Sequence, residues 1–189
     1  MIRETISVGL LGCNCTILGD EVSREAIVVD PGYDVPKILA LLAKHQLTVK
    51  QITGAPILYN KADLPLVAMM DVQAGWFGLE VPEVKPPDHS PADHEEIAVR
   101  GIAGTVLYTP GHSEGSLCLY LPAENLLLAG DTLFAGGVGR TDFPGGNEGK
   151  LLASLRERLA PLPGETVVVP GHGPETTIAT ELASNQWMQ

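Results

Sequence analysis

Residues 109–134 read TPGHSEGSLCLYLPAENLLLAGDTLF, and this stretch predicts both the fold and the place of a site. An apolar run at 105–108 breaks at a Pro-Gly pair, which delivers His112 into a tight loop at a strand end. The two apolar runs that follow are separated by Pro-Ala-Glu, which predicts a hairpin over residues 117–129. The second run ends in Gly-Asp. The hairpin therefore returns Asp131 to the edge of the sheet at which His112 lies.

A later strand of the same character carries another histidine. Residues 167–169 are valines, and Pro-Gly follows them before His172. His112, Asp131 and His172 thus each come just after a buried strand and beside glycines. Imidazole and carboxylate groups are ligands for zinc, iron and manganese. Each of the three alone suits an ordinary turn, but together they predict a metal site.

Four motifs resemble those of the metallo-β-lactamase fold hydrolases, specifically the glyoxalase II-like branch of thioester hydrolases. They are TPGHSEGS, LLAGDTLF, GRTDFPGG and VVVPGHGPET, and IVVDPG at residues 27–32 resembles that family's first motif. The resemblance covers nearly the whole chain. It implies an α/β fold, a four-layer αββα sandwich with two mixed sheets. It also implies that His112 completes one metal site, His172 completes the other, and Asp131 bridges them as the catalytic residue.

The resemblance gives roles to two more side chains. Asp30 is in the family a supporting residue near the metals, although an aspartate that hydrogen-bonds its own turn explains it equally well. Arg140 lies in the GRTDFP loop that these hydrolases share with persulfide dioxygenases. It is the candidate for binding a substrate carboxylate, and an ion pair with Asp142 is the interpretation that we favour.

The sequence departs from the family at one point. In the family, a strand after the first long helix ends in T-H-x-H-x-D-H, which supplies three metal-binding histidines and one metal-binding aspartate. This sequence contains no H-x-H-x-D-H. Residue 52 runs directly into 53 and 54, as though a strand end and a helix of roughly 17 residues had been excised. The one available repair is for residues 49–52 and 56–59 to merge into a single strand.

Two functions follow as alternatives. The first is a metal-dependent thioester hydrolase whose activity is impaired, with at most one weakly held Zn²⁺, Fe or Mn ion. The second is a catalytically inactive family member that acts as a binding or scaffold protein. One metal on a His-Asp-His triad, as in non-haem iron sites, is suggested by ligand type alone.

Composition sets broad limits. A chain of 189 residues with 44% hydrophobic residues is expected to form one domain, 1–189. A formal charge of −11 argues against binding nucleic acid or an anionic membrane. The resemblance to glyoxalase II-like hydrolases implies a small-molecule thioester as the partner if the protein is active. Three cysteines without a framework spacing and no signal-like apolar segment predict reduced thiols and a cytoplasmic location.

Periodicity predicts an alternation of strands and helices. The first three strands should form an antiparallel meander. A long loop is expected at residues 75–91. The meander strands are expected at 2–8, 15–18 and 26–29, and the helices at 35–45, 61–70, 149–160 and 175–184.

Overall fold

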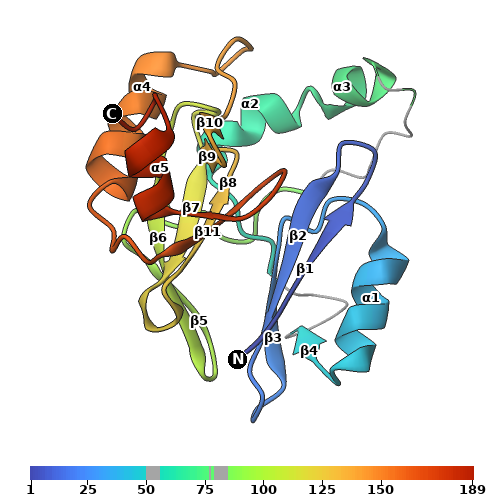
Figure 1. Ribbon diagram of the computed structural model, residues 1–189. Coiled ribbons are helices and arrows are strands. Elements are labelled where there is room, and N and C mark those ends of the chain that lie inside the picture. The colour runs from blue at the N-terminus through green and yellow to red at the C-terminus, as the bar shows by residue number, and fades with distance from the viewer. Residues whose placement is uncertain (50–55, 77, 79–84) are drawn as a thin grey trace.

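The structure is a computed structural model that describes residues 1–49, 56–76, 78 and 85–189. Figure 1 shows its elements in chain order. The strands are β1 (Ile2–Val8), β2 (Cys13–Gly19), β3 (Glu25–Val29), β4 (Thr48–Val49), β5 (Glu96–Val99), β6 (Ile102–Tyr108), β7 (Leu117–Leu121), β8 (Leu126–Gly130), β9 (Leu133–Phe134), β10 (Gly137–Val138), β11 (Val167–Pro170) and β12 (Thr176–Thr177). The helical segments are α1 (Val35–Lys44), η1 (Lys61–Asp63), α2 (Leu64–Val67), α3 (Met70–Trp76), η2 (Pro122–Glu124), α4 (Glu148–Ser154), η3 (Leu155–Leu159) and α5 (Ile178–Ser184).

The first sheet has the order β1-β2-β3-β4. β1, β2 and β3 pair antiparallel, which confirms the expected meander, and β4 pairs parallel to β3. α1 covers the outer face of this sheet (Figure 1). Ile38 and Leu42, four residues apart on one side of α1, are buried against Val8, Cys15 and Ile17. The helix is amphipathic, as its spacing predicts.

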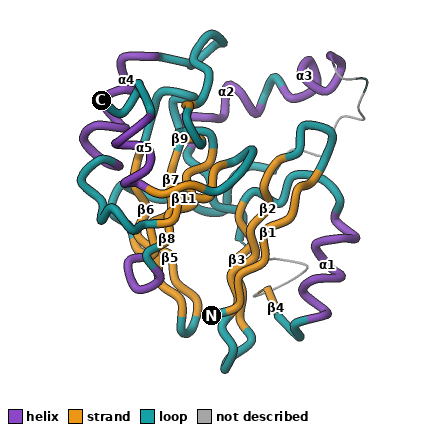
Figure 2. Tube along the Cα trace, in the orientation of Figure 1, coloured by secondary structure: helices purple, strands orange, loops and turns teal. Residues whose placement is uncertain are grey.

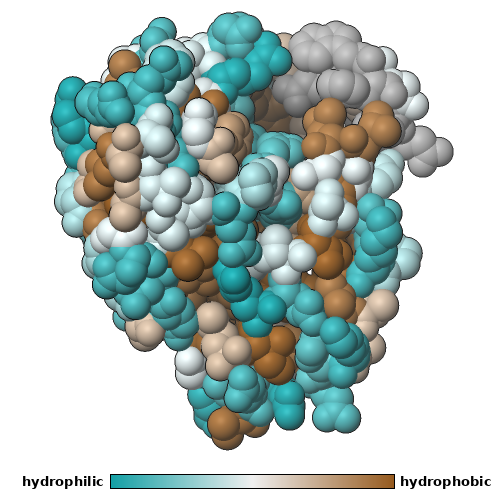
Figure 3. Space-filling model, in the orientation of Figure 1, coloured by the Kyte–Doolittle hydropathy of each residue, from teal (hydrophilic) through white to brown (hydrophobic). Residues whose placement is uncertain are grey.

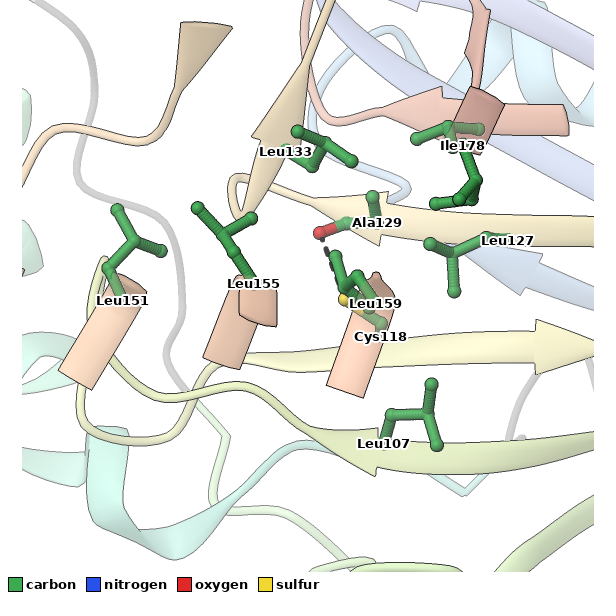
Figure 4. Packing of buried hydrophobic residues seen from close by; sticks show 10 residues of the cluster. Leu107, Cys118, Leu127, Ala129, Leu133, Leu151, Leu155, Leu159 and Ile178 are labelled. Atoms are coloured by element: carbon green, nitrogen blue, oxygen red, sulfur yellow. Dashed lines mark hydrogen bonds between the residues drawn. The ribbon is translucent and has the colours of Figure 1, made fainter. Parts of the chain in front are cut away.

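The second sheet has the order β12-β11-β8-β7-β6-β5. β8 and β11 are parallel, and the other neighbouring strands are antiparallel. α4, η3 and α5 cover its outer face (Figure 2). Leucines of these helices pack against β6, β7 and β8, and the Cys118 thiol donates to the Ala129 carbonyl (Figure 4). This layer forms the largest apolar cluster among the described residues.

A third cluster fills the space between the two sheets. It includes Leu18 of the first sheet and Leu121, Leu128 and Val169 of the second. Helix, sheet, sheet and helix therefore stack in that order, which confirms the expected αββα sandwich with mixed sheets. Among the residues that the structure describes, no helix has the length and apolarity to cross a membrane.

Several predicted boundaries were wrong. Residues 61–70 form no single helix, because Pro65 lacks an amide donor and starts a new helix after the 3-10 turn η1. The predicted start of the loop at residue 75 is wrong, since α3 continues to Trp76, and residues 77 and 79–84 of that prediction lie outside the described ranges. The last helix starts at Ile178 rather than at residue 175, because residues 176–177 pair with β11 as β12.

The predicted helix at 149–160 changes its hydrogen bonding within its length. It is α-helical to Ser154 and then forms the π-turn η3, in which the Ala160 amide donates to the Leu155 carbonyl. The merged strand proposed over 49–52 and 56–59 falls partly on residues 50–55, outside the described ranges. In the described part, Leu58 forms a single parallel bridge with His89.

Candidate metal site

One edge of the second sheet gathers the three candidate ligands. β8 and β11 run parallel, so Asp131 and His172 leave neighbouring strands at the same end. β7 runs antiparallel to β8, so the loop that carries His112 enters at this end too. The Gly171 amide donates to the Gly130 carbonyl at 2.7 Å, which ties the two strand ends together. The sequence therefore brings His112, Asp131 and His172 to one place, as the topology requires.

Asp131 lies between the two imidazoles. Its Oδ2 is 3.4 Å from His112 Nε2, and its Oδ1 is 3.7 Å from His172 Nε2. Two glycines permit this crowding: a Cβ on Gly171 would lie 2.3 Å from Asp131 Oδ1, and one on Gly139 would lie 1.8 Å from the Asp131 carbonyl oxygen. The aspartate is thus held in a cradle that larger residues would fill.

Both imidazoles are oriented through their other nitrogen. His112 Nδ1 lies 2.9 Å from the Arg140 carbonyl, and His172 Nδ1 lies 3.1 Å from the Leu11 carbonyl. A carbonyl can only accept, so each Nδ1 carries a proton and each Nε2 is the nitrogen that faces Asp131. The Phe143 ring packs edge-on against His112, with centroids 4.9 Å apart. Such anchoring of the distal nitrogen is typical of metal-ligating histidines.

The first sheet contributes the remaining wall. The Asn14 amide nitrogen Nδ2 donates to the carbonyls of Pro170 and Gly173, and the Asn14 backbone amide donates to that of Gly171. This clamps the loop of His172. Leu10 and Leu11 at the tip of the β1–β2 hairpin are exposed. Figure 3 shows hydrophobic surface in the region of this tip.

Asp30 follows β3 with a left-handed backbone, φ 51°. Burial first and then the charge of Asp131 raise the pKa of Asp30, His172 opposes them, and the result is a pKa of about 6. Asp30 is exposed to solvent, which weakens the effect of burial, so the negative charge of Asp131 is the firmer reason for its raised pKa. The position near Asp131 and His172 is the one that the supporting role predicts, although no described contact assigns it that role.

Arg140 forms a bidentate ion pair with Asp142. Its Nε lies 2.7 Å from Oδ1 and its Nη2 3.0 Å from Oδ2. Both side chains are exposed, and the guanidinium also lies 5.6 Å from the centre of the Phe143 ring. The ion pair between Arg140 and Asp142, which we favoured from the sequence, is therefore present. The backbone carbonyl of Arg140, rather than its side chain, touches the site.

The chain has no further histidine for this site. All five lie in the described ranges, and the Nε2 atoms of His45, His89 and His94 contact Glu4, Glu95 and Arg158 respectively. Asp131 Oδ1 is buried and has no hydrogen-bond partner among the described residues, as expected of an oxygen that faces a ligand position.

These residues, however, provide too few ligands for a metal centre. Catalytic zinc takes three protein ligands, whereas each oxygen of Asp131 here faces one imidazole. Within the described part of the chain, no group of three or more His, Cys, Asp or Glu side chains is placed to hold one ion. The residues therefore have the donor chemistry of a two-metal centre but do not fit one.

Sequence reasoning missed the residues that hold the site. Asn14, Asp63 and Phe143 act over 30 to 160 positions of sequence. The Cys-Asn-Cys alternation of β2 could have indicated a role for Asn14, since a polar side chain within an apolar strand needs a hydrogen-bond partner. Nothing in the sequence near Asp63 indicates that it reaches the loop of His112.

The family model of the metallo-beta-lactamase superfamily matches residues 48–172. The hydroxyacylglutathione hydrolase GloC of Haemophilus influenzae is 30% identical over 98% of this chain and 97% of its own length. Two solved structures share the whole architecture. The B3 metallo-beta-lactamase BLEG-1 matches with a TM-score of 0.90 and 29% identity over 100% of both chains.

The second, TTHA1623 in a di-iron-bound form, matches with a TM-score of 0.86 and 32% identity over 97% of this chain and 99% of its own. The family model covers most of the chain, including His112, Asp131 and His172. The chain belongs to the metallo-β-lactamase superfamily of metal-dependent hydrolases.

Proposed function

We propose that this chain is a glyoxalase II-like member of the superfamily in which the retained ligands no longer assemble a two-metal centre, so that thioester hydrolysis is strongly reduced. The carrying observation is the pair of half-sites on Asp131, each with one oriented imidazole and no third described ligand. In the family, bound metals lower the pKa of a water molecule and stabilise the oxyanion.

The alignment lengths support a shortened chain. The alignment with the Haemophilus influenzae relative spans 206 positions, although this chain has 189 residues. The relative therefore carries residues that have no counterpart here, which agrees with the excision inferred at the junction of residues 52 and 53. The printed name of that relative, a hydroxyacylglutathione hydrolase, also supports a thioester as the ancestral substrate.

The remaining site residues are held in fixed positions, but they are too few to activate a water molecule through two metal ions. His112 and His172 are fixed by backbone carbonyls, and Asp131 is fixed in its glycine cradle. A preformed but incomplete site suits at most one weakly bound Zn²⁺, Fe or Mn ion. An inactive protein that binds a small molecule or a partner is the alternative, and the same experiments decide between them.

The test combines metal content and turnover. Elemental analysis of protein purified without chelators and then dialysed should find at most one ion per chain. Hydrolysis of S-lactoylglutathione should lie far below that of the Haemophilus influenzae protein assayed in parallel. Two retained ions, or turnover in the normal enzymatic range that Asp131→Ala abolishes, would overturn the proposal.

A gain-of-function variant sharpens the test. A strand-helix segment with the H-x-H-x-D-H motif, taken from a relative that has it, is inserted between residues 52 and 53. The graft should bind two ions and hydrolyse the thioester, because His112, Asp131 and His172 are already in position to complete the ligand set. Its matched control is the same graft with Asp131→Ala, which should fold and lose both properties.

A further inference from the structure

The loop of His112 is held by a carboxylate from a distant segment. Asp63 ends the 3-10 turn η1, and its side chain reaches the loop between β6 and β7. Asp63 Oδ1 accepts a hydrogen bond from the Gly115 amide at 2.7 Å, and Oδ2 accepts one from the Ser113 hydroxyl at 2.9 Å. The two bonds lie on either side of residue 114, so one carboxylate fixes the turn from both ends.

The loop is built to receive this carboxylate. A Cβ on Gly115 would lie 2.6 Å from Asp63 Cγ, so the approach requires glycine at that position. Ser113 is buried, and its amide donates to the Ser116 hydroxyl at 3.0 Å. Without Asp63, the Gly115 amide would lose this partner in a largely enclosed place, and the Ser113 hydroxyl would keep its contact with the Ser116 hydroxyl, 2.8 Å away, but lose its bond to a charged acceptor.

His112 adjoins this anchored turn directly. The Gly111 amide donates to the Ser113 carbonyl at 2.9 Å, which closes the backbone around the histidine. Its ring then has to meet the Arg140 carbonyl on one side and Asp131 on the other. A turn that shifted at Ser113 would carry the imidazole away from both groups.

We propose that Asp63 is a positioning residue for His112, which fixes the imidazole for a ligand through the turn at 113–115. The inference rests on the proposed function only in treating His112 as a site residue. Asp63 lies downstream of the junction at residues 52 and 53. It explains how this half-site stays ordered in a chain that has lost the main ligand motif.

The test uses three variants of the full chain. Asp63→Ala removes both bonds. Asp63→Asn can keep both, because its carbonyl oxygen accepts from the Gly115 amide and its NH₂ group donates to the Ser113 hydroxyl. Asp20→Ala is the matched control: Asp20 accepts from two backbone amides in the β2–β3 turn and lies against Gly101, as Asp63 lies against Gly115.

The readout is the ring of His112, followed by nitrogen-15 NMR with a chelator present. The wild type should show a protected Nδ1–H. Asp63→Ala should speed solvent exchange of this proton and of the Gly115 amide by about tenfold or more, while Asp63→Asn and Asp20→Ala stay within roughly threefold. If Asp63→Ala does not fold, Ser113→Ala removes one of the two bonds and is judged by the same proton.

Two outcomes would overturn the proposal. An unchanged His112 ring beside a freed Gly115 amide would mean that Asp63 is merely structural. An equal effect of Asp20→Ala would mean that the ring reports global stability. The measurement uses neither metal nor turnover, so it stands apart from a failure of the proposed function, which metal content and hydrolysis would reveal.

Discussion

Asp131 carries a negative charge that the described structure leaves only partly compensated. Its buried Oδ1 lacks a hydrogen bond among the described residues, and its charge raises the pKa of nearby Asp30. A partly compensated charge of this kind lowers the stability of the fold while it favours the binding of a ligand, as is common at functional sites.

Replacing this charge should therefore stabilise the metal-free protein. We expect Asp131→Asn to raise the free energy of unfolding by about 1 kcal/mol, measured by urea denaturation at pH 8 with chelator. Asp20→Asn is the control, and its weakened turn bonds should lower the same quantity. A loss of stability in Asp131→Asn would show that the carboxylate is satisfied by interactions that the described structure lacks.

The thiols should be unreactive in the native state. Burial first, with Asp30 contributing, raises the pKa of Cys13 to about 11, of Cys15 to about 12 and of Cys118 to about 11. At pH 8 the thiolate fraction is then on the order of one in a thousand or less, and only the thiolate is nucleophilic. A disulfide reagent should react slowly with native protein and with three thiols after unfolding. Rapid native reaction at one thiol would contradict this.

At the scale of elements, α4 lies directly on the loop of His112. Gly111 makes the contact possible, because a Cβ there would lie 2.4 Å from the Leu151 backbone and its φ is 144°. The Ser154 hydroxyl also donates to the Pro110 carbonyl, and the Asn147 amide donates to that of Gly111. Helix and loop are therefore one packed unit.

A side chain at Gly111 should separate them. We expect Gly111→Ala to cost about 3 kcal/mol or more of unfolding free energy, or to prevent folding, since backbone atoms cannot yield as a side chain can. Gly137→Ala is the control, because no atom lies within 4 Å of its added Cβ. Its thermal midpoint should stay near that of the wild type, and a comparable loss in both variants would refute the packing argument.

Strands proved easier to predict from the sequence than helix ends. The alternating and apolar runs of β1, β7 and β8 mark strands because period two and turn residues are local properties. The break at Pro65 and the β12 pairing of residues 176–177 depend on where neighbouring strands lie. The candidate ligands could be named from strand ends, but Asp63 and Asn14 could not, because their partners are fixed only by tertiary packing.

For the whole molecule, stability should depend little on metal. An ion stabilises a protein in proportion to the logarithm of its concentration over its dissociation constant, so weak binding contributes little. We expect chelator to move the unfolding midpoint by less than about 2 °C in calorimetry. A fall of many degrees would reveal a tightly held ion and contradict the half-site description.

The first sheet has an open edge at β4 within the described residues. In the described part of the chain, β4 is its last strand and pairs on one side with β3. An unpaired edge leaves amides exposed to solvent. Hydrogen exchange should therefore be faster at the outward-facing amides of β4 than in β2, which is paired on both sides. Strong protection there in a monomer would show that residues 49–52 and 56–59 have merged into one strand that covers this edge.

The bond between His172 and the Leu11 carbonyl joins the two ends of the chain, 161 positions apart. Domains form during synthesis from the amino terminus, so the β1–β2 hairpin must leave the ribosome long before its partner exists. The hairpin therefore waits for most of the domain to be made, and a metal ion can bind at His172 in its final position only after residue 172 has emerged and met the Leu11 carbonyl.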